Sequence, residues 1–375
     1  MISSAYAIEL LKKALEIYTP SRSEALLANL IKEKCLDDLG FEKVNIDSVG
    51  NVIATKGSGS PRILLCGHTD TVPGHIPVRM DSGFLFGRGA SDAKAPLISM
   101  LLACSEFKQR GTIIFAGVVD EEGNATGIKE LVKNKLSVDY AIFGEPSGID
   151  KITISYKGRL ALKFTCDVLD SAHASAPWLS KNSIEELYEV WKMLSNEISS
   201  KYNKTDKKSE SVSISLTEIS GGSSHNVTPQ KCKITIDIRV PNGVKCLEVL
   251  NYLDNSIKNI SEIRKVKITY RIEDMTEPFE ADHSSPLVRA LSLSILDICK
   301  VRPLLLRKTG TGDMNVLGNS LKIPMVTYGP GEPHVSHSKD ERVEINSYLT
   351  SIEIYNRAIF HTSRLHHNKR DTSTK

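Results

Sequence analysis

The sequence predicts an α/β protein in which a mostly parallel sheet is flanked by helices and interrupted by an inserted α+β domain. Three observations support this fold class. Strands and helices alternate from residue 51 to residue 143, which is typical of parallel sheets covered on both faces. The run Gly111–Val119 is apolar and rich in β-branched residues, as expected of a strand buried on both sides. Near Lys151 the pattern changes to strands in which apolar and polar residues alternate.

Two helices are expected before the alternating strands. Apolar residues at helical spacing predict a helix over residues 5–18, and a second helix over 21–39 follows with Ser21 or Ser23 as its N-cap. The strands predicted after them cover residues 51–55, 62–66, 85–88, 111–119 and 140–143, and the intervening helices cover 95–108 and 128–134. We therefore expect a sheet with helices on both faces.

The inserted domain is predicted over residues 154–274. Its strands and helices follow the order β-α-β-β-α-β of a ferredoxin-like split βαβ unit. The remaining residues, 1–153 and 275–375, form the domain that it interrupts. Within the second of these segments the pattern predicts helices over 286–299 and 344–360 around a strand at 325–328. The last residues, 366–375, are polar and charged, and we expect a disordered tail there.

Composition excludes several classes of protein. The formal net charge of +3 is small for 375 residues, and Lys and Arg are spread along the chain apart from local concentrations at 201–208 and in the tail, which argues against a nucleic-acid-binding protein. The seven cysteines are odd in number and contain no C-x-x-C pair, so neither a disulfide framework nor a cysteine zinc site is expected. Because the chain has no secretory signal and no run of 18 apolar residues, we expect a cytoplasmic protein without a membrane partner.

The first segment with side chains suited to metal binding or catalysis is Leu64–Asp70, where a buried strand runs into a loop that carries His68 and Asp70. Ligands bind at the carboxyl ends of strands in open α/β sheets. A metal-bound histidine needs a partner for its second ring nitrogen, and a nearby aspartate is a typical one. The alternative is a loop histidine beside a solvated aspartate.

Two further acidic segments lie next to predicted elements. Asp92 directly precedes a helix, so it is either a metal ligand or the N-cap of that helix. Asp120, Glu121 and Glu122 follow the buried strand at 111–119. Carboxylates this close repel one another unless a cation compensates, and a metal pair would allow one to bind metal while its neighbour handles the proton of an attacking water. The alternative is a solvated acidic turn.

The last two segments are Gly144-Glu145, just after a short buried strand, and a loop with His334 and His337 after the strand at 325–328. Either histidine could be a ligand, or neither. Taken together, the segments supply His, Asp, Glu, Glu and His after different core elements. Such a set suits a pair of zinc-like ions bridged by one carboxylate.

In order and spacing, these segments resemble the co-catalytic metallopeptidases of the M20 family, whose fold is zinc-peptidase-like with an inserted lid and dimerisation domain. The motifs that carry the resemblance are His68-Thr69-Asp70, Gly89-Ala90-Ser91-Asp92, Asp120-Glu121-Glu122-Gly123, Gly144-Glu145-Pro146-Ser147 and His337. The resemblance implies that one ion is held by His68, Asp92 and Glu145, and the other by Asp92, Glu122 and His337. It makes Asp70 the residue that orients His68, and Glu121 the general base.

The inserted domain carries further parts of the resemblance. Ser171–Ser175 is similar to the lid motif whose histidine, here His173, stabilises the oxyanion, although Ala172 stands where the family has glycine. Asn226 and Arg239 match residues that bind substrate. Alternatively, Arg239 pairs with Asp237 on the same strand. Thr309-Gly310-Thr311-Gly312-Asp313 resembles the segment that lines the substrate pocket, which implicates Gly310 and Thr311.

The segment Arg307–Asn315 is most similar to the lysine-releasing branch of the family. This resemblance implies an amidohydrolase of lysine and arginine biosynthesis, with two Zn²⁺ or Co²⁺ ions, that frees lysine or ornithine from an acidic amino-group carrier protein and dimerises through the inserted domain. The alternatives are desuccinylation of succinyl-diaminopimelate, deacetylation of acetylornithine, or another aminoacylase or peptidase activity. A non-catalytic binding module is disfavoured because Glu121 and all five ligands are present.

Overall fold

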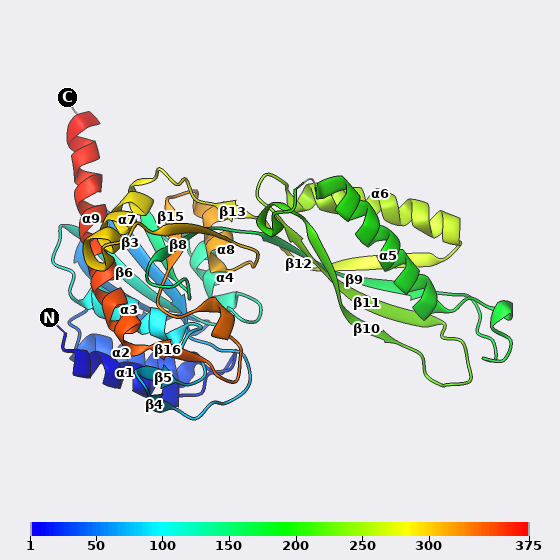
Figure 1. Ribbon diagram of the computed structural model, residues 1–375, viewed down its shortest axis with the longest axis horizontal. Coiled ribbons are helices and arrows are strands. Elements are labelled where there is room, and N and C mark those ends of the chain that lie inside the picture. The colour runs from blue at the N-terminus through cyan, green and yellow to red at the C-terminus, as the bar shows by residue number, and fades with distance from the viewer. Residues whose placement is uncertain (1, 204, 374–375) are drawn as a thin grey trace. The chain divides into compact units, whose positions relative to one another are not determined.

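The structure is a computed structural model that describes residues 2–203 and 205–373. The chain divides into two compact units (Figure 1). Unit 1 comprises residues 1–154, 281–306 and 312–375, and unit 2 comprises residues 155–280 and 307–311. Among the described residues, no helix combines the length and the apolar character needed to cross a membrane.

The large sheet has the strand order β1-β2-β6-β3-β7-β15-β8-β13, and β14 also pairs with β8. Its strands are β1 (Lys43–Ile46), β2 (Val52–Ser58), β3 (Arg62–His68), β6 (Gly111–Val118), β7 (Tyr140–Gly144), β8 (Lys151–Tyr156), β13 (Phe279–Glu280), β14 (Leu304–Lys308) and β15 (Met325–Tyr328). The four central strands, β6, β3, β7 and β15, are parallel, and the strands toward both edges pair antiparallel. The predicted α/β class with a mostly parallel sheet flanked by helices is confirmed.

Seven helices of the described chain belong to unit 1: α1 (Ser4–Glu16), α2 (Ala25–Asp37), α3 (Lys94–Ser105), α4 (Thr126–Lys133), α7 (Pro286–Cys299), α8 (Asp313–Leu321) and α9 (Ile345–Ser373). Helix α3 packs against β3 and β6 on one side and against α1 and α9 on the other. Residues 94–104 are therefore buried all around, which explains why this helix is apolar on every face. A small separate sheet pairs β4 (Arg79–Asp81) with β5 (Phe84–Phe86) and β5 with β16 (Arg342–Glu344).

Strand direction determines where the chemical groups of unit 1 lie. Strands β3, β6, β7 and β15 run parallel, so their carboxyl ends meet at one edge of the sheet. His68 is the last residue of β3, and Asp120 and Glu145 follow β6 and β7 within two residues. Side chains that are far apart in the sequence therefore meet at this edge.

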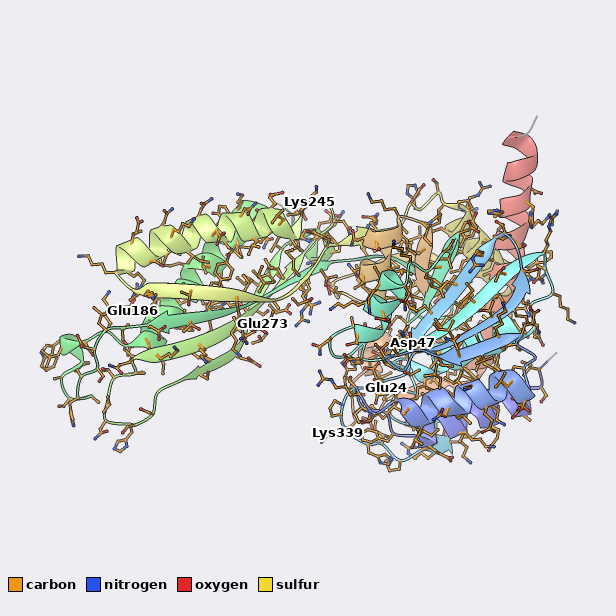
Figure 2. All side chains as sticks on the ribbon, turned by 180° about the vertical axis from the view of Figure 1, so that it is seen from behind. Glu24, Asp47, Glu186, Lys245, Glu273 and Lys339 are labelled. Carbon is orange, nitrogen blue, oxygen red and sulfur yellow. The ribbon has the colours of Figure 1, made fainter. Side chains whose placement is uncertain are left out.

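One predicted helix cap is wrong, and the alternative interpretation of Asp92 as a helix cap is excluded. Helix α2 starts at Ala25 with Glu24 as its N-cap, and Glu24 makes no capping hydrogen bond. Its carboxylate instead accepts the backbone N–H of Asp120 at 3.0 Å (Glu24 is labelled in Figure 2). The hydroxyl of Ser21 donates to Asp70 at 2.7 Å. At helix α3 the N-cap is Ala93, so Asp92 is not the capping residue.

The tail differs from the prediction as well. Helix α9 continues to Ser373, although we expected disorder from residue 366; residues 374 and 375 lie outside the described part of the chain. Within this part of the helix, the imidazole of His366 hydrogen-bonds to the hydroxyls of Ser60 at 3.0 Å and Tyr140 at 3.2 Å. These contacts hold the helix against unit 1 beyond residue 360, where the sequence pattern weakens.

Unit 2 contains the order β9 (Gly158–Asp167), α5 (Ser183–Tyr202), β10 (Ser213–Gly221), β11 (Lys231–Val240), α6 (Cys246–Arg264) and β12 (Lys267–Thr276). Its sheet has the order β10-β11-β9-β12 and is antiparallel throughout. Both helices cover one face, where Leu160, Leu162 and Phe164 of β9 lie in a core of their own (Figure 1). The predicted ferredoxin-like α+β architecture of the inserted segment is confirmed.

Candidate metal centre

His68 is held in one orientation by Asp70. Its Nδ1–H donates to the backbone carbonyl of Asp70 at 2.9 Å and lies 3.5 Å from the Asp70 carboxylate. Because Nδ1 carries the proton, the lone pair of the neutral ring is on Nε2. This nitrogen lies 3.3 Å from Asp92 Oδ1 and 3.6 Å from Glu145 Oε1. His68 therefore presents a metal-binding nitrogen to two carboxylates.

Asp70 also fixes the acidic turn after β6. Its two carboxylate oxygens accept the backbone N–H groups of Glu121 and Glu122, each at 3.1 Å. Burial disfavours ionisation of Asp70, but its contacts with His68, Ser21 and Glu121 outweigh burial and lower its pKa. An ionised Asp70 thus positions the histidine and the turn at the same time.

Two groups of side chains bring their donor atoms within 4.8 Å of one another: His68, Asp92 and Glu145 form the first, and Asp92, Glu122 and His337 form the second. Asp92 belongs to both. Its Oδ1 faces His68, while its Oδ2 lies 3.4 Å from His337 Nε2. The same His337 nitrogen lies 2.8 Å from Glu122 Oε1. The alternative histidine, His334, is in neither group.

Charge and burial in these two groups suit cations. Hydrogen bonds to Asp92 and Glu122 raise the pKa of His337 to about 10. Burial opposes protonation of His68, but Asp70 and Asp92 overcome it, so that its pKa is also raised. Histidines surrounded by so many carboxylates bind protons tightly and offer the same lone pairs to a divalent ion. Each group supplies one imidazole nitrogen and two carboxylate oxygens, and this donor set fits Zn²⁺-like ions.

Glu121 lies next to the two groups and belongs to neither. Burial, together with the charges of Glu145, Asp313 and Glu122, raises the pKa of Glu121 well above its usual range, against a lowering effect of His68. Asp313, the first residue of α8, is buried, and burial raises its pKa to about 7. Its Oδ1 atom has no hydrogen-bond partner among the described residues. From the sequence, Asp313 was named only as the last residue of a glycine-rich segment, and no role was predicted for it.

Arg88 and Glu341 form a buried pair that the sequence analysis missed. Glu341 Oε1 accepts the backbone N–H groups of Ser91 at 3.1 Å and Asp92 at 2.9 Å, and its Oε2 accepts Arg88 Nη1 at 2.7 Å. Arg88 also donates to the backbone carbonyl of Ser338 at 3.1 Å. The pair thereby joins the loop that carries Asp92 to the loop that carries His337. The sequence feature that could have indicated a role for Glu341 is its spacing from the candidate ligand, His337-x-x-x-Glu341.

The other expected site residues lie in unit 2. His173 forms an isolated β-bridge with Val227, and the backbone carbonyl of the adjacent Asn226 accepts the N–H of Ala174 at 2.8 Å. Thr311 donates its hydroxyl to the backbone carbonyl of Lys157 at 2.7 Å, and the space around Gly310 is open. Arg239 donates from Nε to Asp237 at 2.6 Å.

Arg239 therefore pairs with Asp237 on the same strand, which was the alternative expected from the sequence. Asp237 also accepts a hydrogen bond from Arg159 on β9 at 2.7 Å.

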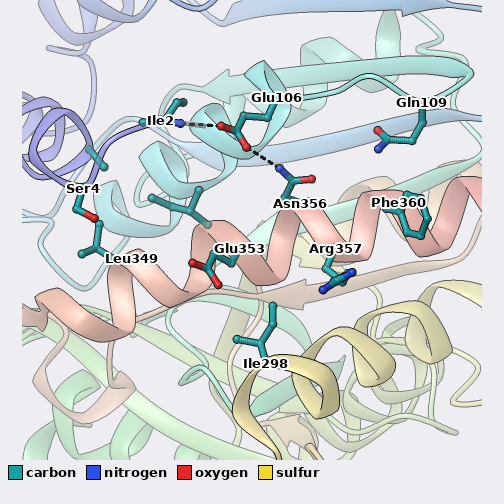
Figure 3. Close-up of a pocket in the computed structure, with 12 residues that line it drawn as sticks. Ile2, Ser4, Glu106, Gln109, Ile298, Leu349, Glu353, Asn356, Arg357 and Phe360 are labelled. Atoms are coloured by element: carbon teal, nitrogen blue, oxygen red, sulfur yellow. Dashed lines mark hydrogen bonds between the residues drawn. The ribbon is translucent and has the colours of Figure 1, made fainter.

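A groove of about 480 Å³ elsewhere in unit 1 contains none of the expected site residues (Figure 3). It is lined by α1, α7, α9 and the loop after α3. Inside it, Glu106 accepts the backbone N–H of Ile2 at 2.7 Å and the amide of Asn356 at 3.0 Å. This groove is therefore separate from the two donor groups.

Metal-dependent hydrolases are the class of enzyme to which this fold and these donor groups correspond. The family model described as "Peptidase family M20/M25/M40" matches residues 64–361, and the chain belongs to this family. The chain is accordingly a metal-dependent hydrolase of linear amide bonds.

Relatives cover almost the whole chain. A Saccharolobus solfataricus protein named LysW-lysine/LysW-ornithine hydrolase is 32% identical over 94% of this chain and 95% of its own length. A Pyrococcus furiosus protein that bears the same name provisionally is 36% identical over 97% of this chain and 99% of its own length.

Solved structures show the same fold. Aminopeptidase PepT from Bacillus cereus aligns with a TM-score of 0.80 at 18% identity, covering 96% of this chain and 99% of its own. An M20 family metallo-carboxypeptidase from Sulfolobus solfataricus aligns with a TM-score of 0.79 at 19% identity, covering 97% of this chain and 99% of its own.

Proposed function

We propose that this enzyme hydrolyses the amide bond that joins lysine or ornithine to a LysW-type amino-group carrier protein. The observation that carries the proposal is the pair of donor groups sharing Asp92, with Glu121 beside them, in a chain whose full-length relatives bear that substrate in their names. The segment Arg307–Asn315, with its resemblance to the lysine-releasing branch, supports the same substrate.

Two divalent cations, Zn²⁺ or Co²⁺, would be held by these groups. His68, Asp92 and Glu145 would bind one, Glu122 and His337 would bind the other, and Asp92 would contribute to both. When bound, such a pair polarises the amide carbonyl and lowers the pKa of water. The ligand set is open on the side of His337, whose side chain is 50% exposed, and this leaves room for the substrate's amide.

Glu121 is the proposed general base. It would take a proton from the attacking water and deliver it to the nitrogen of the breaking C–N bond, so that the products are a carboxylate on the carrier and a free amino group on lysine. Asp70 supports this role because its carboxylate holds the backbone N–H of Glu121. The turn that presents the Glu121 side chain is fixed on both sides, because Asp70 also accepts the backbone N–H of Glu122 and Glu24 accepts that of Asp120.

His173 is the proposed donor to the developing oxyanion. The backbone N–H of Ser175 donates to His173 Nδ1 at 3.2 Å, so the proton of the neutral imidazole lies on Nε2. An exposed Nε2–H is the group that oxyanion stabilisation requires. Asn226, Arg239, Gly310 and Thr311 are the proposed substrate-binding residues in the same unit. For Arg239, contact with a substrate carboxylate would compete with Asp237.

We also propose that two copies associate through unit 2. Leu169, Trp178 and Leu179 are 95%, 78% and 71% exposed in the loop that carries His173. Strand β10 is an edge strand of the sheet and is solvent-accessible along its length. Exposed apolar groups beside an open edge strand favour pairing with a second chain.

The test is a release assay. Free lysine and free ornithine are measured after the purified enzyme is incubated with each carrier conjugate, beside N-acetyl-lysine, N-acetylornithine and succinyl-diaminopimelate. We expect the carrier conjugates to be hydrolysed with the highest kcat/KM. A higher kcat/KM on a small acetyl or succinyl compound would overturn the proposed substrate while leaving the hydrolase class intact.

A further inference from the structure

The sheet of unit 2 has one face that its own helices do not cover. Leu160, Leu162 and Phe164 point into the core beneath α5 and α6. The alternate residues of the same strand, Arg159 and Lys163 among them, therefore point to the opposite face. The register of β10, β11 and β12 against β9 identifies the residues that share this face, which we call the open face.

The open face is basic. Its charged side chains are Arg159, Lys163, Asp167, Glu218, Lys231, Lys233, Asp237, Arg239, Lys267, Arg271 and Asp274, with Glu273 in the adjoining bulge. They comprise seven basic and five acidic groups, a net charge of +2. Helices α5 and α6, which cover the other face, carry seven acidic and four basic side chains, a net charge of −3. Unit 2 is thus electrostatically polarised across its sheet (Figure 2 labels Glu186 of α5 and Glu273 of β12).

The basic groups are arranged in a way that the fold alone does not favour. Lys163 of β9 lies directly opposite Arg271 of β12 in the register, on the same face. Like charges in such cross-strand positions destabilise a sheet. Lys163 forms a salt bridge with Glu218 at 3.6 Å, and Arg271 forms one with its neighbour Glu273, so that each positive charge has an acidic partner.

Two more lysines stand beside this pair. Lys233 and Lys267 are exposed, and neither forms a salt bridge within the described part of the chain. In the register, Lys231 and Lys267 both lie opposite Asp167, but among the described residues the Asp167 carboxylate pairs with Lys231 alone, at 3.1 Å. The excess of positive charge is therefore concentrated at the end of the face where Lys231, Lys233 and Lys267 lie.

The size of the face indicates a large partner. From Arg159 to Asp167, β9 rises over eight residues, or roughly 26 Å at 3.3 Å per residue. This span exceeds the length of a lysine or ornithine molecule. A second copy of the chain is disfavoured as the occupant because two open faces would bring together like charges.

We propose that the open face of unit 2 is the docking surface for an acidic region of the protein that carries the amino acid. The inference rests on the proposed function, since it requires a protein-linked substrate. Carboxylates on the partner would compensate Lys233 and Lys267 and reduce the repulsion between Lys163 and Arg271. Complementary charge of this kind speeds encounter and selects the partner, and its effect weakens as salt is added.

The test compares two double variants that change the formal charge equally. Lys233→Glu with Lys267→Glu reverses two charges on the open face. Lys192→Glu with Lys258→Glu reverses two charges on α5 and α6 of the same unit. Each protein is assayed on the carrier conjugate and on a short peptide with the same lysine linkage, at salt concentrations from about 0.05 M to about 0.5 M, where the screening length falls from roughly 14 Å to roughly 4 Å.

At low salt we expect the open-face variant to lower the ratio of kcat/KM for the conjugate to kcat/KM for the peptide by about tenfold, and the helix variant to change it less than twofold. At high salt the three proteins should converge. A ratio within twofold of the wild type for the open-face variant overturns the docking surface but leaves the proposed function standing.

Two other outcomes also overturn the docking surface. If the wild type leaves the conjugate intact while it cleaves the peptide, both the proposed substrate and the docking surface fail. If the ratio is unchanged but the open-face variant loses affinity for single-stranded RNA, or changes its sedimentation coefficient, the face serves a nucleic acid or a second copy instead.

Discussion

At the scale of single residues, Asp92 is the centre of the site. Its two carboxylate oxygens face different histidines, Oδ1 toward His68 and Oδ2 toward His337. These contacts lower its pKa despite the opposing effect of burial. In the absence of a bound ion, the negative charge of Asp92 is therefore matched by protons on the histidines, and metal must compete with those protons.

This competition predicts how metal binding depends on pH. His337 has a pKa of about 10 among the side chains alone, and only its neutral form can bind metal. The affinity for the ion that Asp92, Glu122 and His337 would hold should thus rise with pH. The rise should be roughly tenfold per pH unit below about pH 10, because each ion bound displaces one proton from His337. Titration calorimetry of the metal-free protein in buffers of different ionisation enthalpy measures the affinity and the number of protons displaced per ion. Affinity that is constant between pH 6 and pH 8 would contradict the arrangement.

Glu121 gives the sharpest prediction for catalysis. Glu121→Gln removes the carboxylate that moves the proton and leaves both donor groups intact, so kcat should fall by about 10² to 10⁴. Metal content, measured by mass spectrometry, should stay at the wild-type value. Glu353→Gln is a matched control, because Glu353 is an exposed side chain of α9 that lines the separate groove. Equal kcat in the Glu121 and Glu353 variants would exclude Glu121 as the base.

At the scale of elements, the loop before α3 and the loop before β16 depend on each other. Glu341 is fully buried and accepts two backbone N–H groups from the first loop. Arg88, in that first loop, donates a hydrogen bond to the carbonyl of Ser338 in the second. His337 itself adopts a left-handed φ of +62°, which few residues other than glycine favour. The buried pair can keep this backbone in place because it fixes the residue that follows.

The buried pair predicts a loss of metal affinity in a variant far from any substrate contact. Glu341→Gln keeps an oxygen for the N–H groups of Ser91 and Asp92 but weakens the contact with Arg88, so metal affinity should fall by about 10- to 100-fold, as for other residues that orient ligands. Glu341→Ala would leave a buried guanidinium without its carboxylate and should destabilise the fold by roughly 3–5 kcal/mol.

Competition with a chromophoric chelator measures the affinity, and thermal unfolding measures the stability. Glu344→Gln, at an exposed position three residues further along the chain, is the control. A Glu341→Gln variant with wild-type metal affinity would show that the two loops hold their ligands independently.

At the scale of the whole molecule, the two units have separate sources of stability. The candidate ligands of unit 1 come from residues 68 to 337, so bound ions would connect five segments of that unit. Unit 2 has its own core beneath α5 and α6 and contributes no member to either donor group.

Removal of metal should therefore affect the units differently. A chelator should abolish activity and lower the stability of unit 1 by about 4 kcal/mol if the free ion was present at 1,000 times its dissociation constant. Zn²⁺ or Co²⁺ should restore both. Hydrogen exchange followed by mass spectrometry should show faster exchange in residues 62–145 and unchanged exchange in β9 and β11. Equal acceleration in both units would indicate that they unfold as one.

Much of the fold could be predicted because periodicity reports burial directly. The apolar run of β6 and the alternating strands of unit 2 have the predicted structure, since each pattern fits only one kind of environment. The short strands β1, β4, β13, β14 and β16 and the helix α8 were not predicted. They contain too few residues for a period to be recognised, and their pairing with distant strands determines them.

Candidate ligands could be named from the sequence because their residue types recur at fixed positions after strands and in motifs that resemble a known family. His334 and His337, however, were equivalent by residue type and by their place after β15. In the structure only His337 joins Glu122 and Asp92 within ligand distance. Arg239 likewise had two candidate partners, and the strand geometry of β11 gives it Asp237.

By itself the sequence determined the α/β class and the inserted ferredoxin-like order and supplied the candidate metal ligands, because these follow from local pattern and side-chain chemistry. Only the tertiary structure decided that Asp92 faces both histidines, that Glu341 with Arg88 joins the two loops, and that unit 2 is basic on its uncovered face. Those features depend on which segments lie side by side, and no local period encodes a contact across 250 residues such as that between Arg88 and Glu341, whose separation is 253.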